Sequence, residues 1–299
     1  MAGGPSWERV SRYDRLAVVL DVDQLTSTGT VKITLQAIDD RPFLFSPGHW
    51  VGIEEEVPGL GLRRSPYCVM SGPSADRGFA ILIRVFPEGP LAHHLASLQS
   101  GDLVHFRGPA GRSMLPKDAA TDLVLVATGV GVSPLHALCC DLLARRDGRD
   151  IRLYWGLRSP ADICLVDDLN ALADHHPNFS YQISLSQPPS GWPQLRGRVT
   201  ESVPPLLDKL RGKFFVLSGN GAMVEEMEVA LTSVGVDRTS IHSERFFNIR
   251  HRPDPATVNA IVARFSAADR QASNTNLDDL ESIFRLQRDI HGRPTGHPH

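Results

Sequence analysis

The sequence of 299 residues has few cysteines, no long apolar run and no excess of one charge sign. Its four cysteines lack both an extracellular disulfide framework and the spacing of a plant-type iron–sulfur cluster. No segment approaches the roughly 20 apolar residues that span a bilayer, and the N-terminus has no apolar core of signal-peptide length. We therefore expect a cytoplasmic protein that is not inserted in a membrane.

Basic and acidic residues are mixed along the chain, and the formal net charge is −3. Nucleic-acid-binding surfaces show a clustered basic face, so no nucleic-acid partner is expected. The histidines of the last nine residues, His291, His297 and His299, lie in a polar tail that shows no ordered second shell for a metal. The sequence therefore favours small molecules or proteins as partners and predicts no metal site.

The hydrophobic pattern changes near residue 116. Up to about residue 113, short runs rich in Val, Ile, Leu and Phe alternate with turn signals, which indicates an antiparallel barrel or sandwich. After Thr121, apolar strands alternate with helices, the pattern of a parallel sheet covered on both faces. We expect a β-barrel domain at 1–116, an α/β domain at 117–247 and a partly helical extension with a disordered tail at 248–299.

The α/β half contains regularly spaced elements. The expected strands and helices are strands 123–127, 151–155, 179–185, 213–217 and 239–243, and helices 134–145, 165–174, 201–210 and 222–234.

The junction at 123–134 carries the most specific local signal. Its apolar run is followed directly by Thr-Gly-Val-Gly-Val-Ser-Pro and then by a helical pattern. Gly129 and Gly131 let the backbone turn sharply and approach a ligand, and Ser133-Pro134 fits the start of a helix. A helix N-terminus favours anions, so the junction predicts phosphate or pyrophosphate binding, with plain strand-to-helix packing as the alternative.

Several motifs in one order make residues 8–247 resemble the ferredoxin–NADP reductase family of flavoproteins. The segment Phe-Ser-Pro-Gly-His-Trp-Val at 45–51 resembles the family's turn into the flavin sheet. The segment Arg-Arg-Ser-Pro-Tyr-Cys-Val at 63–69 resembles its arginine-x-tyrosine-serine flavin motif. The resemblance implies flavin contacts from Arg64, Ser65, Tyr67, Cys68 and Val69.

This flavin motif departs from the family pattern. Two residues rather than one separate Arg64 from Tyr67, and Cys68 stands where Ser or Thr is usual. Alternatively, Pro66 and Tyr67 occupy the tyrosine and serine places. Chemically, an Arg can pair with a flavin phosphate and a Tyr can lie against the isoalloxazine ring.

Two further segments resemble flavin-binding elements. Residues 87–95 resemble the helix start whose amides hold the pyrophosphate, which implies contacts from Gly89, Leu91 and Ala92 and favours FAD over FMN. Ala92 replaces a usual Ser or Thr. The end of the resemblance, at 241–247, implies a carboxylate, Glu244, and an aromatic ring, Phe247 or its neighbour, beside the flavin.

Four segments at the carboxyl ends of expected strands resemble the family's nicotinamide-binding elements, and ligands bind at such ends in open α/β sheets. The implied contacts are Thr128, Gly129, Val130, Gly131, Arg158, Ser186, Arg196, Arg198, Gly219, Asn220 and Met223. Gln187 occupies the loop position where an Arg favours the 2′-phosphate of NADPH, so the sequence favours NADH. Arg158, Arg196 and Arg198 are near enough in the pattern to supply positive charge, so NADPH stays open.

The resemblance implies an oxidoreductase that takes hydride from NADH or NADPH onto FAD and passes electrons to a separate acceptor, such as a ferredoxin, a flavodoxin or an oxygenase component. It implies catalytic roles for Tyr67, Thr128, Glu244 and Ser218, which stands in a cysteine place. Two alternatives stay open: a reductase of small acceptors such as free flavin, quinone or ferric chelates, and a non-catalytic docking or regulatory subunit. The extension at 248–299 is a candidate cap for the flavin or dock for the acceptor.

Overall fold

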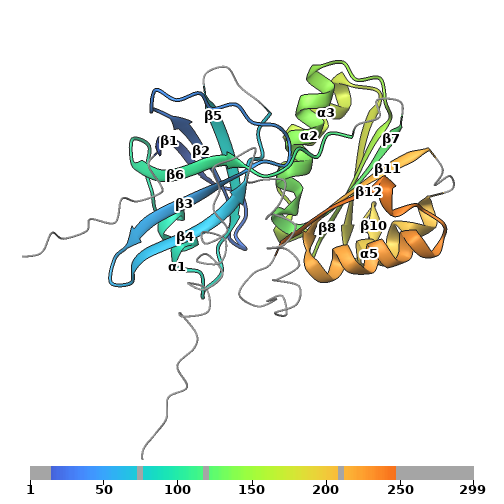
Figure 1. The fold of residues 1–299 in the computed structure, drawn as a ribbon. Helices are drawn as coiled ribbons and strands as arrows, with labels where there is room; N and C mark the ends of the chain where they lie inside the picture. Colours follow the sequence, from blue (N-terminus) through green and yellow to red (C-terminus); the bar gives the residue numbers. More distant parts are fainter. Residues whose placement is uncertain (1–14, 73–76, 117–120, 208–211, 247–299) are drawn as a thin grey trace, which may run out of the picture.

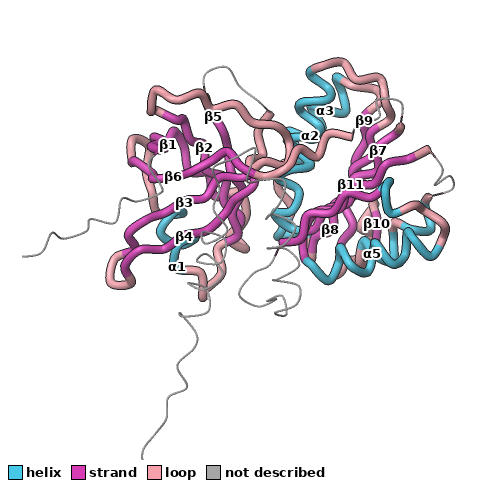
Figure 2. Tube along the Cα trace, in the orientation of Figure 1, coloured by secondary structure: helices cyan, strands magenta, loops and turns pink. Residues whose placement is uncertain are grey.

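The computed structural model describes residues 15–72, 77–116, 121–207 and 212–246, and these residues form two sheets with their own helices. Figures 1 and 2 show the β-rich half beside the α/β half, with helix α2 (Val132–Ala144) facing the strands of the first half. No helix in the described ranges is long and apolar enough to cross a membrane. The predicted extension at 248–299 lies outside the described residues.

The first sheet is antiparallel and has six strands in the order β4-β3-β6-β1-β2-β5. Its elements are β1 (Arg15–Gln24), β2 (Thr30–Ala37), β3 (Trp50–Val57), β4 (Gly61–Cys68), β5 (Gly78–Arg84), helix α1 (Pro90–Ala96) and β6 (Leu103–Ala110). The sheet curls so far that the chain after β4 reaches β5, where Val69 forms a bridge with Ile81. The predicted antiparallel barrel is confirmed.

The barrel core follows from strand alternation, because every second side chain points inward. Val31, Ile33 and Leu35 of β2 are buried in this way. Phe43, Phe79 and Phe106 pack together, with ring centroids 4.7 to 5.7 Å apart. These rings fill the interior of the barrel. The strands around them carry the barrel side of the candidate site.

The second sheet is parallel and has six strands in the order β10-β9-β8-β7-β11-β12. Its strands are β7 (Asp122–Thr128), β8 (Ile151–Leu157), β9 (Phe179–Leu185), β10 (Leu195–Arg196), β11 (Lys213–Asn220) and β12 (Ile241–Phe246). Leu123, Leu125 and Ala127 of β7 share a core with α2, and the alternate residues Val124 and Val126 share another with the opposite helices. This confirms the predicted sheet, buried on both faces.

Helices cover the two faces of this sheet. Helix α2 and α3 (Val166–His175) contribute to one core, and α4 (Val199–Ser202) and α5 (Gly221–Ser233) to the other. The helix predicted over 201–210 is wrong in its extent, since α4 ends at Ser202 and a 3-10 turn follows at Pro204–Leu206. Proline has no N–H to donate, so two successive prolines interrupt the helix.

The two halves are in direct contact. Met70, Ala80, Leu82 and Met114 of the barrel half belong to the same apolar core as α2. The buried His136 of α2 also hydrogen-bonds through Nδ1 to the Met70 carbonyl oxygen at 2.9 Å. The interface holds the carboxyl end of the parallel sheet against the barrel, which is where the candidate site lies.

Candidate functional site

A cavity of about 1000 Å³ lies between the two halves, and both halves contribute its walls. Its walls include most of the residues that the sequence analysis singled out. These are Arg64, Ser65, Tyr67, Cys68, Gly89, Leu91, Ala92, Thr128, Gly129, Val130, Arg158, Ser186, Arg198, Gly219, Asn220, Met223 and Glu244. The flavin-motif residues and the glycine loop, far apart in the sequence, therefore face one space.

Arg64 reaches the cavity from β4 and is held there by Glu54. The two residues are opposite each other in the β3–β4 ladder, and the Arg64 guanidinium donates a hydrogen bond to the Glu54 carboxylate. Glu54 is only 4% exposed. A buried carboxylate needs such a partner, so the pair fixes the Arg64 guanidinium at the wall.

Tyr67 and Cys68 end the same strand and are both protonated at neutral pH. Burial raises the pKa of Tyr67 to about 12, against a smaller opposite effect of the hydrogen bond with Ser65. Burial also raises the pKa of the Cys68 thiol, and the negative charge of Glu244 raises it further. Cys68 is therefore a neutral S–H group facing the cavity rather than a reactive thiolate.

Helix α1 presents backbone amides to the cavity. Its first intrahelical bond runs from the His93 amide to the Gly89 carbonyl oxygen at 3.1 Å, which leaves the amides of Leu91 and Ala92 ahead of the helical ladder. The Gly89 amide itself donates to the Phe86 carbonyl oxygen at 2.9 Å. Amides at a helix start have no acceptor within the helix and can bind a phosphate. In α1 these are the amides of Leu91 and Ala92.

The glycine loop after β7 is a 3-10 turn, Gly129–Gly131, in which Gly129 has a φ of +53°. Glycine adopts this left-handed conformation without the strain that a Cβ would add. The indole N–H of the buried Trp155 donates to the Gly129 carbonyl oxygen at 2.9 Å. The turn is thus held from the sheet side and its open side faces the cavity.

The loops after β7 and β11 touch through glycines. A Cβ on Gly131 would lie 2.5 Å from the Gly219 Cα, and Gly219 has a φ of +142°. Beside this contact, the Asn220 amide donates to Thr128 Oγ1 at 3.1 Å. The two predicted nicotinamide elements are therefore joined into one wall.

Five of the predicted site residues do not lie at the cavity surface or are not described. Val69, Gly131, Arg196 and Ser218 are not part of the cavity wall, and Phe247 lies outside the described residues. Ser218 is fully buried at the end of β11, and its Oγ has no hydrogen-bond partner in the described part of the chain. Its neighbour Gly219 is the residue that reaches the cavity.

The wall also contains Phe246, the predicted alternative to Phe247, and three residues that were not predicted as site residues, Trp50, Arg84 and Asp162. Trp50 and Phe246 add aromatic surface, and Arg84 and Asp162 add charge. Trp50 and Asp162 lie within segments that resemble the family, and Phe246 is the neighbour of the predicted Phe247. Arg84 ends an otherwise apolar strand, and a charge at the end of such a strand is the signal that could have found it.

Two protein-family models match this chain. "Oxidoreductase FAD-binding domain" covers residues 18–114 and "Oxidoreductase NAD-binding domain" covers residues 125–228. Ferredoxin–NADP reductase B of Sorangium cellulosum is 28% identical over 72% of this chain and 91% of its own length. The reductase subunit of an Amycolatopsis aromatic O-demethylase is 30% identical over 78% of this chain and 69% of its own.

A solved structure shows the same arrangement. The crystal structure of an Amycolatopsis cytochrome P450 reductase superposes with a TM-score of 0.70 at 29% identity, over 78% of this chain and 69% of that one. The chain belongs to the ferredoxin–NADP reductase family. As a member of this family it is an NAD(P)H-dependent FAD reductase.

The residues present fit the FAD of a ferredoxin–NADP reductase. The Arg64 cation and the Leu91 and Ala92 amides lie on the barrel wall where phosphates need positive charge and donors. Trp50, Tyr67 and Phe246 supply aromatic surface for a flat ring. The volume of about 1000 Å³ lies at the upper end of the range for ligand pockets.

Proposed function

We propose that this reductase takes hydride from NADH onto FAD and passes the electrons to a separate protein, a ferredoxin or an oxygenase component. The observation that carries the proposal is the single cavity whose barrel wall bears the flavin motif and whose opposite wall bears the glycine loop. Among the relatives is the toluate 1,2-dioxygenase electron transfer component of Pseudomonas putida, 29% identical over 77% of this chain and 67% of its own length. The role of this relative supports an oxygenase-type acceptor.

Each wall has its own task in this proposal. Arg64 and the α1 amides hold the FAD phosphates, and Tyr67 lies against the flavin ring. Thr128, Gly129 and Val130 bind the coenzyme phosphates and orient the nicotinamide. When bound, FAD supplies hydride acceptance and electron release, and the chain contributes position and electrostatics.

The reaction also releases a proton, and a residue must carry it away from the flavin. NADH gives up a hydride, which is two electrons and one proton, so one proton must leave the site for each NADH whose electrons go to one-electron acceptors. Glu244 lines the cavity and its Oε1 lies 3.2 Å from His242 Nε2. We assign proton transfer at the flavin edge to Glu244, with Cys68 as the neutral neighbour of its carboxylate.

Charge pairing around the outer part of the cavity favours NADH over NADPH. Arg198 Nη2 lies 3.0 Å from a Glu226 carboxylate oxygen, and Arg158 Nε donates to Gln187 Oε1 at 3.3 Å. A 2′-phosphate would have to compete with Glu226 for Arg198, and the carboxylate repels it. The side chain of Arg196 instead donates to the Pro189 carbonyl oxygen.

Absorbance of the purified protein between about 350 and 550 nm, followed anaerobically during addition of NADH and then NADPH, tests the proposal. We expect flavin bands that bleach with either nucleotide and at a lower concentration of NADH. A colourless protein that FAD cannot reconstitute would support the non-catalytic docking subunit instead. Equal or better bleaching by NADPH would contradict the preference for NADH and would leave the reductase function in place.

The acceptor is tested in steady-state turnover with the same protein. We expect rapid reduction of a ferredoxin or oxygenase component at low micromolar concentration of that partner. Rapid turnover with free flavin, quinone or ferric chelates, together with failure on every protein carrier, would support the small-acceptor alternative.

A further inference from the structure

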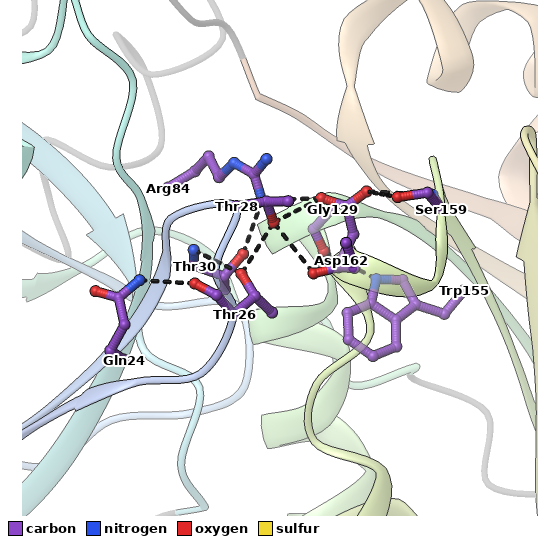
Figure 3. A network of polar contacts seen from close by, with 10 residues as sticks. Gln24, Thr26, Thr28, Thr30, Arg84, Gly129, Trp155, Ser159 and Asp162 are labelled. Atoms are coloured by element: carbon purple, nitrogen blue, oxygen red, sulfur yellow. Dashed lines mark hydrogen bonds and ion pairs between the residues drawn. The ribbon is translucent and has the colours of Figure 1, made fainter.

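A polar network joins the two halves at the edge of the cavity (Figure 3), and Asp162 lies at its centre. Asp162 belongs to a 3-10 turn, Pro160–Asp162, that follows β8 in the nicotinamide-binding half. Its partners Thr28 and Arg84 belong to the barrel half, Thr28 in the turn between β1 and β2 and Arg84 at the end of β5. The network therefore crosses the domain boundary.

Two contacts of this network cross the boundary to the same carboxylate oxygen of Asp162, and Thr28 Oγ1 also lies 3.3 Å from the Ala161 carbonyl oxygen. Thr28 Oγ1 donates to Asp162 Oδ1 at 2.8 Å, and Arg84 Nη1 approaches the same oxygen at 3.2 Å. Arg84 Nη1 also donates to the hydroxyls of Thr28 and Thr30, each at 3.0 Å. The barrel thus offers Asp162 a donor and a cation that are already held in place by each other.

The second oxygen of Asp162 is held by its own domain. The Ser159 amide and hydroxyl donate to Asp162 Oδ2 at 3.2 and 3.1 Å. Burial raises the pKa of this carboxyl, but the hydrogen bonds from Thr28 and Ser159 and the charge of Arg84 outweigh it and keep the pKa below its usual range. Asp162 is therefore an ionised carboxylate that is hydrogen-bonded to both halves of the molecule, and its side chain has little freedom.

Arg84 and Asp162 also form part of the cavity wall. Hydride transfer needs reacting atoms about 3–3.5 Å apart, and a displacement of about 1 Å can cost about a hundredfold in rate. The flavin elements lie in the barrel and the nicotinamide loops lie in the other half, so this separation depends on how the domains are held. We propose that Asp162 is a positioning residue that, through Thr28 and Arg84, sets the separation between flavin and nicotinamide.

The proposal rests on hydride transfer from a nicotinamide to FAD, and it distinguishes positioning from nucleotide binding. If Asp162 sets the separation, its loss lowers the limiting rate of flavin reduction more than it weakens nucleotide affinity. If Asp162 or Arg84 acts only as a nucleotide contact, the affinity changes and the limiting rate stays. Stopped-flow reduction of the FAD-loaded protein at a series of NADH concentrations separates the two quantities.

The decisive variants are Asp162→Asn and Thr28→Val. We expect the limiting rate of reduction by NADH to fall by about tenfold to a hundredfold in D162N and by less in T28V. Asp162→Asn removes the charge and one acceptor oxygen, and Thr28→Val removes a donor to the same carboxylate, so both act on one network and their effects should not add in the double variant. Dithionite reduces the flavin without a bound nicotinamide, so the rate of reduction by dithionite should stay at the parent value. Asp162→Glu should recover part of the rate of reduction by NADH.

Asp147→Asn is the matched control. Asp147 forms an ion pair with Arg149 at 2.6 Å within the nicotinamide-binding half, outside the cavity wall, so its loss removes a comparable contact without touching the boundary. We expect D147N to reduce FAD at the parent rate. Parent-like limiting rates in both D162N and T28V, or a change in NADH affinity alone, would overturn the positioning role.

Failure of the parent protein itself to be reduced by NADH or NADPH would overturn both this role and the reductase function. If D162N does not fold, T28V carries the test, because valine has nearly the shape of threonine and lacks the hydroxyl that reaches Asp162.

Discussion

The contact between Gly131 and Gly219 leaves no room for a side chain. A Cβ on Gly131 would lie 2.5 Å from both the Gly219 Cα and the Ser218 carbonyl oxygen, although the Gly131 backbone, with φ at −61°, is open to any residue. Gly131→Ala should therefore push the two nicotinamide loops apart. We expect a loss of about 1–3 kcal/mol in the free energy of unfolding and weaker NADH binding.

Gly148→Ala is the control for that substitution, because a Cβ on Gly148 meets nothing within 4 Å. Urea unfolding and NADH titration of both variants separate a packing effect from a general loss of glycine. G131A with parent-like stability and affinity would show that the loops can move apart freely, which contradicts a joined wall.

Single residues were predictable where the signal is local. Gly129 has the positive φ and the place at the cavity that a sharp, ligand-facing turn requires, and its contact with a phosphate stays a prediction. Gly131 was assigned the same ligand-facing role, whereas the structure places it against Gly219. No local pattern could show this, since the two glycines lie in loops after different strands and meet only because β7 and β11 are neighbours in the sheet.

Strand β1 begins with a buried ion pair that fastens the barrel. Arg15 is 6% exposed, donates to both Asp39 carboxylate oxygens at 2.9 and 3.0 Å, and lies against the rings of Phe43 and Phe106. Asp39→Asn removes the charge that Arg15 needs. We expect a loss of about 1.5–3 kcal/mol at pH 7, the range for hydrogen bonds to charged groups.

The effect of Asp39→Asn should depend on pH. Burial raises the pKa of Asp39, but its hydrogen bond and charge interaction with Arg15 outweigh this and lower the pKa below the usual 3.8. A lowered folded pKa gives stability that is complete above the unfolded pKa and is lost as pH falls through the folded value. The difference between parent and D39N should therefore be full above about pH 5 and shrink below about pH 4.

Urea unfolding at pH 7 and at low pH measures this difference. Asp23→Asn is the control, because Asp23 is 47% exposed and pairs with Lys32 at 3.7 Å on the same sheet. An exposed pair contributes roughly 0–1 kcal/mol, so D23N should stay close to the parent at both pH values. A constant D39N deficit down to low pH would contradict the ionised Asp39–Arg15 pair.

Elements were predictable where hydrophobic periodicity was regular. The strand predicted at 179–185 has those same limits, and α2, α5 and β8 differ by a few residues at one end or both. Strand β4 is harder to predict, because Arg63, Arg64 and Ser65 interrupt any apolar alternation and the strand is ordered by pairing with β3, which periodicity does not show. The prediction of a helix at 201–210 was wrong in its extent, because it gave the apolar spacing more weight than the two prolines that interrupt the helix.

At the scale of the whole molecule, the cavity exists only because two domains meet. Motif order predicted that one domain holds the flavin and the other the nicotinamide. It could not predict Arg84 facing Asp162, since contacts between residues 78 positions apart depend on how the domains pack. The same holds for the packing of α2 against Met114. The domain boundary near residue 116 stays a prediction, since residues 117–120 lie outside the described ranges.

The cavity also makes the stability of the molecule depend on which flavin occupies it. A ligand present at 100 times its dissociation constant stabilises the folded state by about 2.7 kcal/mol, so removal of FAD should lower the Tm by several degrees. In the proposed function the amides of Leu91 and Ala92 bind a pyrophosphate, whose second phosphate FMN lacks. Calorimetry of the stripped protein with equal concentrations of FAD and FMN should therefore show a clearly larger rise in Tm with FAD. Equal rises would mean that α1 takes no part in holding the cofactor and that the barrel wall around Arg64 and Tyr67 does so alone.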